Sequence, residues 1–223
     1  MKWSFKRDAF ALTLIAVSII VALYFYSILP QTVPSYFGSG GVPKGYSSKL
    51  SLVLLGTGIP IVTYFLVTFS PFVDPFKKRF ETNFSVFLLV RDIVIGFAVF
   101  MMSLLFISAK DGIFRTDLYG IGLGLLFILL GNYLPKLPRN FFFGIRSPWT
   151  LASDIVWYRT HRISGSLFVI SGVLFIILNI LKVNLGISLL IILVPLVLYT
   201  AFIYPYLLYR KLQKEGKLNK PDL

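Results

Sequence analysis

Six long apolar stretches, separated by polar segments, make up most of this chain. They lie near residues 9–29, 50–69, 84–107, 118–134, 164–181 and 185–209. Each is close to the roughly 20 residues that an α-helix needs to cross the hydrocarbon core of a bilayer. The pattern therefore predicts an all-α integral membrane protein with six transmembrane helices in one membrane domain, residues 1–223. The first stretch is longer than the apolar region of a signal peptide, so we expect it to be retained.

Two polar segments between these stretches carry distinctive residue patterns. Residues 30–49, here called the first loop, are rich in Gly, Ser and Pro, which indicates ordered turns rather than strands or helices. Residues 131–165, here called the motif block, are dense in Pro, Asn, Arg and Trp and contain the only histidine, His161. A chain that only had to sit in a bilayer would not need such a block.

The motif block predicts a break in the helical pattern. Pro135 should end the fourth helix because it cannot continue the backbone hydrogen bonding, and Asn132 and Asn140 can satisfy backbone groups left free there. Thr150 or Ser153 is a candidate N-cap for a short amphipathic helix. We therefore expect an interfacial segment between the fourth and fifth transmembrane helices.

Composition supports a membrane protein and narrows the chemistry. The chain is 57% hydrophobic and 14% charged, with a mean hydropathy of +0.82, whereas a soluble domain has about a quarter of its residues charged. The absence of cysteine excludes disulfides, thiolate metal sites and cysteine nucleophiles, and one histidine cannot form a multi-histidine metal site. We expect no metal and no cofactor.

The net charge of +13 comes mainly from Lys and Arg residues in the segments between the apolar stretches. If the N-terminus lies in the cytoplasm, sixteen of the 22 Lys and Arg residues fall in inner segments and five in outer ones. Cytoplasmic loops of membrane proteins carry this excess of positive charge. The charge therefore indicates a membrane protein with both termini and the motif block inside and the first loop outside, and no nucleic-acid partner.

The motif block has two interpretations from its residues alone. One is a basic interfacial helix held by anionic lipid. The other is a docking or ligand surface formed by Arg146, Trp149, Trp157, His161 and Arg162.

Charged residues within the spans are few. Arg91 and Asp92 lie about two turns into the third stretch. Charges at membrane depth are costly and often functional, although Arg91 is near enough to one end to extend its side chain to the headgroups. No Ser–His–Asp set and no paired carboxylates at mid-membrane are found, so we expect no enzymatic activity. Glycines in the fourth and fifth stretches indicate close helix packing.

The motif block resembles the SdpI family, the membrane family of the sporulation-delay toxin immunity protein. The matching positions are Asn132, Tyr133, Leu134, Pro135, Lys136, Asn140, Phe142, residues 144–151, Trp157, Thr160, His161, Arg162 and Gly165. The first loop resembles an N-terminal domain common in this family at Leu29, Pro30, Val33, Pro34, Phe37, Gly41, Pro43, Gly45, Tyr46 and Lys49. Together the two segments carry the resemblance over nearly the whole chain.

Several positions depart from the family pattern. In the first loop, Tyr36 stands where the family often has His, Gly38 replaces a common Asn and Lys44 replaces a common acid. In the motif block, Ser147 replaces a usual Thr and Asp154 a usual Glu. The motif block is nearly intact, so the cytoplasmic role of the family is the better supported expectation.

The resemblance implies a location in the plasma membrane and a function as well as a six-helix fold. The best-known member of the family protects its cell from a secreted peptide toxin and, with toxin bound, holds a transcriptional repressor at the membrane. By resemblance we expect toxin contacts in the first loop at Pro30, Pro34, Tyr36, Phe37, Gly41, Gly45 and Tyr46. We expect partner docking in the motif block at Asn132, Tyr133, Pro135, Asn140, Gly144, Arg146, Pro148, Trp149, Thr150, Trp157, His161 and Arg162.

Two other functions stay open at this point. One is a small transporter or lipid-handling protein with Arg91, Asp92 and Arg146 lining a polar cavity. The other is a structural partner of another membrane protein. A transporter needs a continuous path accessible to water, whereas a receptor needs a sealed bundle with a groove on one face.

Overall fold

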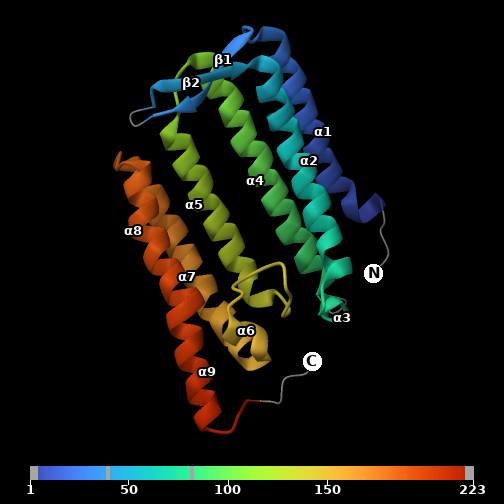
Figure 1. The fold of residues 1–223 in the computed structure, drawn as a ribbon, viewed down its shortest axis with the longest axis vertical. Coiled ribbons are helices and arrows are strands. Elements are labelled where there is room, and N and C mark those ends of the chain that lie inside the picture. Colours follow the sequence, from blue (N-terminus) through green and yellow to red (C-terminus); the bar gives the residue numbers. More distant parts are fainter. Residues whose placement is uncertain (1–4, 39–40, 81–82, 219–223) are drawn as a thin grey trace. The chain divides into compact units, whose positions relative to one another are not determined.

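The computed structural model describes residues 5–38, 41–80 and 83–218 (Figure 1). Six helical segments in this part of the chain are long and apolar enough to cross a membrane. Five are the helices α1 (Phe5–Ile28), α2 (Lys49–Val73), α4 (Phe84–Asp111), α5 (Thr116–Tyr133) and α7 (Asp154–Ile180). The sixth combines α8 (Leu185–Val197), a π-helical segment (Leu198–Ile203) and α9 (Tyr204–Lys214). The predicted all-α, six-span fold class is confirmed.

Within the described ranges, three shorter helices and two strands connect the spans. The helices are α3 (Lys77–Phe80), the 3₁₀-helix Leu134–Lys136 and α6 (Pro148–Ala152), and the strands are β1 (Thr32–Phe37) and β2 (Pro43–Ser48). The chain divides into two compact units, one of Met1–Thr68 with Arg91–Gly122 and one of Phe69–Val90 with Leu123–Leu223. The long helices α2, α4 and α5 each contribute to both units. The single membrane domain stays a prediction.

The core of the first unit lies between α1, α2 and α4. Phe25 and Phe106 stack with ring centroids 5.3 Å apart, and Gly56 lets them do so, since a Cβ there would overlap the Phe106 ring. The buried cluster around this stack contains Ala22, Phe25, Leu29, Val33, Leu52, Phe106 and Ala109. Its apolar residues come from α1, α2, α4 and the first strand, so the core fixes the position of the first loop on this unit.

The first loop is a β-hairpin, and the prediction of turns rather than strands was wrong. β1 and β2 pair antiparallel, with Pro34 opposite Tyr46 and with irregularities on either side of Tyr36. Proline removes one donor from a ladder and is tolerated at bulges and strand starts, and that is where Pro34 and Pro43 lie. Val33 is fully buried, so one inward side chain anchors a strand whose composition otherwise indicated turns.

In the second unit α5 and α7 pack through glycines, as predicted from their small residues. A Cβ at Gly131 would lie 2.6 Å from the carbonyl oxygen of Gly165, and one at Gly165 would lie 2.7 Å from that of Gly131. Gly124 and Gly172 form the same kind of contact, with a Cβ at Gly124 lying 2.6 Å from the Gly172 carbonyl oxygen. The glycines are seven residues apart on each helix and pair in reverse order, so α5 and α7 run antiparallel and touch backbone to backbone.

The fifth span begins ten residues earlier than the apolar pattern indicated. The predicted range was 164–181, but α7 starts at Asp154 and continues unbroken to Ile180. A short helix, α6, does lie between the fourth and fifth spans. Trp157, His161 and Arg162 are therefore on the first turns of a transmembrane helix and not on a separate interfacial one.

Candidate functional site

The motif block begins where α5 ends. α5 stops at Tyr133, and the 3₁₀-helix that follows has Pro135 within its first turn, which confirms the predicted helix end. Leu137 then adopts an extended backbone. This exit brings the chain into an irregular loop of about ten residues that ends at the N-cap of α6.

Asn140 shapes this loop from inside. Its side chain is fully buried, and its Oδ1 accepts hydrogen bonds from the backbone N–H groups of Phe142 at 2.9 Å and Phe143 at 2.6 Å. Its Nδ2 donates to the carbonyl of Pro138 at 2.9 Å. The prediction that an Asn satisfies free backbone groups is confirmed for Asn140. It is wrong for Asn132, which donates to Ile128 one turn back within α5 at 2.8 Å.

His161 is a structural acceptor in this site. It is fully buried, and its Nε2 accepts the backbone N–H of Ile145 at 3.0 Å while its Nδ1 lies 2.8 Å from the carbonyl oxygen of Trp157. Because Nε2 accepts, Nδ1 must carry the proton and donate, so the imidazole is the neutral Nδ1–H tautomer. Gly144, at φ 93°, lies against this ring, where any Cβ would overlap Nε2.

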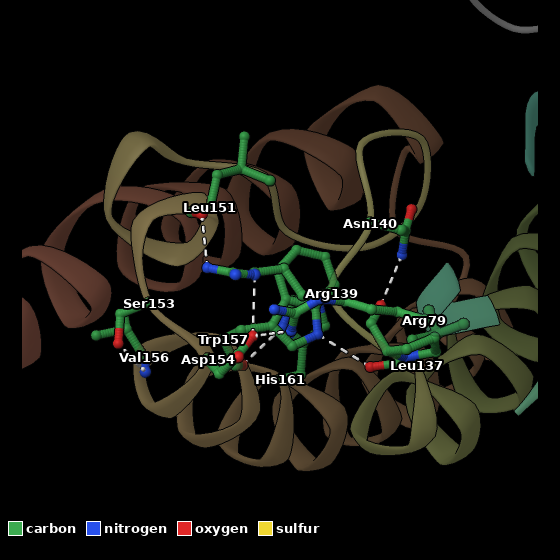
Figure 2. A network of polar contacts seen from close by, with 11 residues as sticks. Arg79, Leu137, Arg139, Asn140, Leu151, Ser153, Asp154, Val156, Trp157 and His161 are labelled. Carbon is green, nitrogen blue, oxygen red and sulfur yellow. Dashed lines mark hydrogen bonds and ion pairs between the residues drawn. The ribbon is translucent and has the colours of Figure 1, made fainter. Parts of the chain in front are cut away.

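Trp157 completes the connection between α7 and the loop. The indole is fully buried, stacks on His161 with centroids 4.0 Å apart, and donates from Nε1 to the carbonyl of Leu137 at 2.9 Å (Figure 2). Both polar side chains of this pair thus have partners within the block. Direct docking of a partner by Trp157 and His161 stays a prediction, and in this structure both hold the loop against α7.

The end of the loop is fixed by a capping box. Ser147 caps α6, and the Thr150 hydroxyl accepts the backbone N–H of Ser147 at 2.8 Å. Pro148 occupies the first turn of α6, and Trp149 packs on Tyr206 of α9 with ring centroids 5.2 Å apart. The predicted cap role is confirmed for Ser153, which caps α7, whereas Thr150 is the third residue of a box capped by Ser147.

An ion-pair network that the sequence pattern did not reveal joins the block to α3. Asp154 pairs with Arg79 of α3 and lies 2.9 Å from Nε of Arg139, as Figure 2 shows. Arg139 is nearly fully buried and also donates to the carbonyl of Leu151 at 3.0 Å. The single carboxylate of Asp154 therefore lies between two guanidinium groups that are distant in sequence.

A second connection comes from the segment between α2 and α3. Asp74 is buried, and its carboxylate accepts the backbone N–H of Phe141 at 2.8 Å and that of Phe76 at 2.7 Å. The guanidinium of Arg139 lies 4.8 Å from the centroid of the Phe76 ring. In the sequence, Asp74 directly precedes a proline between two apolar stretches. That position was the signal that could have indicated a role for its carboxylate in binding backbone groups.

Several side chains of the block are exposed. Arg146 is exposed and donates from Nη1 to the carbonyl of Phe141 at 2.7 Å. The Phe141 and Phe142 rings beside it are 50% and 37% exposed. The predicted docking residues outside this group vary: Asn132, Pro148 and Arg162 are exposed, while Tyr133 and Trp149 are half-buried. Phe141, Phe142 and Arg146 thus form one exposed group on the loop, and docking of a partner on the block stays a prediction.

The first-loop residues form a hairpin surface. Tyr36 and Tyr46 are 65% and 64% exposed, and Gly45 lies opposite Tyr36 in the ladder. Phe37 packs on Phe114 with centroids 5.3 Å apart. Gly41, at φ 76°, accepts the Phe114 backbone N–H at 3.2 Å. Pro30 and Pro34, the other two predicted contacts, are exposed and half-buried respectively.

The intramembrane charges form a cluster within the first unit. Arg91 is fully buried; it pairs with Asp8 of α1, donates to Asp92 at 2.8 Å and reaches the carbonyl of Arg7 at 3.2 Å. Its guanidinium is therefore satisfied inside the protein rather than extended to the headgroups. Sequence reasoning missed Asp8, which lies in the first turn of α1, before the apolar stretch. In the described ranges, no group of three or more His, Cys, Asp or Glu residues could hold a metal ion.

Comparison with known proteins matches both segments singled out above. Residues 136–207 match the SdpI/YfhL protein family, and residues 13–59 match a domain of unknown function, DUF1648. The chain is 26% identical over 208 residues to the immunity protein SdpI of Bacillus subtilis (strain 168), a match that covers 93% of this chain and 98% of that protein. No solved structure matches the chain. The predicted family resemblance is confirmed.

Proposed function

This chain belongs to the SdpI family, and from that premise we propose that it is a membrane immunity protein that binds an extracellular peptide toxin and protects the cell without enzymatic chemistry. The observation that carries the proposal is the match to an immunity protein over nearly the full length of both chains. Because both patterned segments are included, the relationship extends beyond a shared set of apolar helices.

The proposed orientation places the first loop outside the cell and the motif block inside. The hairpin follows one span and the motif block follows four, so the two emerge on opposite sides of any membrane that each span crosses. The excess of Lys and Arg on the connections that follow the second and fourth spans supports a cytoplasmic location for those connections.

The hairpin is the proposed toxin-binding element. Tyr36, Val42 and Tyr46 are each more than 60% exposed, and they lie outside the apolar spans. Among the described residues only β1 and β2 make up this sheet, so its outer edges carry unpaired backbone groups. An extended peptide can add to such an edge by main-chain hydrogen bonds, with its side chains held by neighbouring rings.

Helix α5 provides a route from the hairpin to the motif block. Phe37 of the hairpin packs on Phe114, and Phe114 stacks on Tyr119 in the first turn of α5 with centroids 4.2 Å apart. The far end of α5 holds Gly131, which touches Gly165 of α7. A toxin shifts this helix pair only if it binds one of its arrangements more tightly than the other.

Inside the cell, the proposed output is docking of a repressor protein on the exposed part of the motif block. Phe141, Phe142 and Arg146 offer two aromatic rings and a guanidinium, and aromatic residues and Arg are enriched at protein interfaces. The buried His161 and Trp157 would act indirectly, by holding the loop that presents them.

A survival assay tests the immunity function. The chain is expressed in a bacterium sensitive to the sporulation-delay peptide toxin, membrane insertion is confirmed, and the toxin is titrated against cells with and without it. We expect protection that is lost in the double variant Tyr36→Ala, Tyr46→Ala. The matched control is Ile113→Ala, an exposed side chain (63%) in the loop between α4 and α5, which should keep protection. Full insertion with no protection would contradict the proposal for this toxin.

A further inference from the structure

Helix α9 has one face buried and one face charged. Leu208 and Leu212 are buried and pack with Val156 of α7, which fixes the helix to the second unit. On the remaining surface, Arg210, Lys211 and Lys214 are exposed. The buried leucines therefore hold these cations in place on a rigid element rather than on a mobile tail.

An open, shallow pocket lies along the charged face. Its volume is about 480 Å³, and it is lined by Tyr206, Leu207, Arg210, Lys211, Lys214 and Glu215. Residues 206, 210 and 214 follow each other at four-residue spacing, as do 207, 211 and 215, so the lining consists of two neighbouring stripes of one helix. Trp149 packs on Tyr206 and so supports the apolar end of the pocket.

The pocket is strongly positive. Its one acid, Glu215, pairs with Lys217 at 2.9 Å, and that hydrogen bond lowers the pKa of the Glu215 carboxyl, so its negative charge is already compensated. Over residues 5–38, 41–80 and 83–218, no ion pair involves Arg210, Lys211 or Lys214. Within those ranges, none of these three cations on one stretch of helix is directly paired with a carboxylate, and Lys211 has only a longer-range interaction with Glu215.

Along the axis of α9, apolar and aromatic residues come first and charged residues follow, which matches the change from hydrocarbon to headgroups at a membrane surface. The sixth span, Leu185–Lys214, has 30 residues and is about 45 Å long at 1.5 Å per residue. The hydrocarbon core is only about 30 Å thick, so it ends about 20 residues into the span, just before Tyr206. Tyr206 and Leu207 then lie at the acyl boundary, and Arg210 to Lys214 lie in the headgroup layer.

We propose that this pocket binds the headgroup of an anionic phospholipid. The Arg210 guanidinium and the Lys214 ammonium would contact the phosphate and the acidic headgroup, and Tyr206 with Leu207 would contact the glycerol and the upper acyl chain. Clusters of basic residues that directly follow a transmembrane helix attract acidic lipids; here a shaped pocket adds a defined position. This site is separate from the motif-block loop and does not depend on the proposed immunity function.

Lipid counting on the full-length protein tests the proposal. The protein is purified in a neutral detergent and titrated with phosphatidylglycerol, with phosphatidylcholine of the same acyl chains, and with inorganic phosphate as a free anion. Native mass spectrometry counts the bound lipids. We expect one phosphatidylglycerol to bind more tightly than phosphatidylcholine and to resist millimolar phosphate.

Two charge-matched double variants separate a site from general attraction. Arg210→Gln with Lys214→Gln should weaken phosphatidylglycerol binding about 25-fold, at about fivefold for each basic residue near a membrane surface. Lys77→Gln with Lys78→Gln removes the same charge from exposed positions on α3 and should change binding less than about twofold. The charge-retaining pair Arg210→Lys, Lys214→Arg should keep binding and reports on folding of the altered helix.

Three results would overturn the proposal. Equal losses in the two Gln pairs would mean diffuse attraction without a site. Equal binding of phosphatidylcholine would mean that the headgroup charge is not recognised. Displacement of the lipid by inorganic phosphate would mean a site for soluble anions.

Discussion

At the scale of single residues, His161 shows how a motif position acquires its role. The chain has one histidine, and from the sequence a single histidine next to arginines suggests a chemical or docking role. In the structure both ring nitrogens are used by backbone groups, Ile145 N–H and the Trp157 carbonyl. A histidine fits this position because an uncharged imidazole is one of few side chains that accept a hydrogen bond at one end and donate one at the other.

Replacing this imidazole should destabilise the fold without touching any exposed surface. His161→Phe keeps the ring volume but leaves the buried N–H of Ile145 without an acceptor, which costs about 1–3 kcal/mol. The matched control is Arg162→Gln, the exposed neighbour, for which we expect a change within about 0.5 kcal/mol. Thermal unfolding in detergent measures both, and equal midpoints would contradict the role assigned to His161.

Asp154 is the second residue whose neighbours determine the expected effect of a substitution. It is the carboxylate that both Arg79 and Arg139 contact, and Arg139 is 3% exposed. Asp154→Asn should therefore destabilise the protein by about 1–3 kcal/mol, because Arg139 loses its charged partner but keeps its bond to the Leu151 carbonyl, and the Asp154 side chain is already 37% exposed. Asp154→Glu keeps the charge and should lose much less; chemical denaturation curves that rank the two variants in the opposite order would exclude this explanation.

At the scale of elements, the contact between α5 and α7 depends on backbone proximity. Lipid surrounds both helices in a membrane, so hydrophobic burial contributes little and close packing dominates their association. The seven-residue spacing of the contact glycines leaves one face of each helix without side chains at two points about two turns apart. The two helices therefore touch over Gly124 with Gly172 and Gly131 with Gly165.

A single methyl group at this contact should separate the helices. Gly165→Ala places a Cβ 2.7 Å from the Gly131 carbonyl oxygen, an overlap that costs about 1–3 kcal/mol. Gly58→Ala is the control, because Gly58 lies in the α2 helix with no atom within 4 Å of an added Cβ. There alanine should be neutral or stabilising by up to about 1 kcal/mol, and the measurement is the shift in the unfolding midpoint of each variant.

The sequence predicted some elements well and others not at all. Apolar length alone identified the six spans, because hydrocarbon imposes a length on every helix that crosses it. It could not identify the start of α7, since the first turns of that helix are polar and bury their polarity against the loop. The network of Asp154 with Arg79 and Arg139 was invisible, because Arg79 is 75 residues away along the chain and only folding reveals that they meet. The hairpin was missed because its prolines occupy a bulge and a strand start.

At the scale of the whole molecule, the proposed topology can be tested with single cysteines, since the chain contains none to remove. Lys44→Cys in β2 should react with a membrane-impermeant maleimide on intact cells. Lys136→Cys at the end of the fourth span should react only after lysis. Both side chains are exposed in the structure, so accessibility to the reagent depends on the side of the membrane alone. The reverse labelling pattern would contradict a cytoplasmic motif block.

The buried pair of Asp8 and Arg91 also affects the order of events while the chain is being synthesised. The two residues are separated by 83 positions, so a ribosome that adds about 5–20 residues per second makes Arg91 roughly 4–17 s after Asp8. During that interval the carboxylate at the start of α1 has no guanidinium partner and is best accommodated in water at the membrane surface. The first helix can therefore reach its final depth only after the third has been synthesised, and a nascent chain arrested before Arg91 should hold its first helix displaced toward the side of its N-terminus.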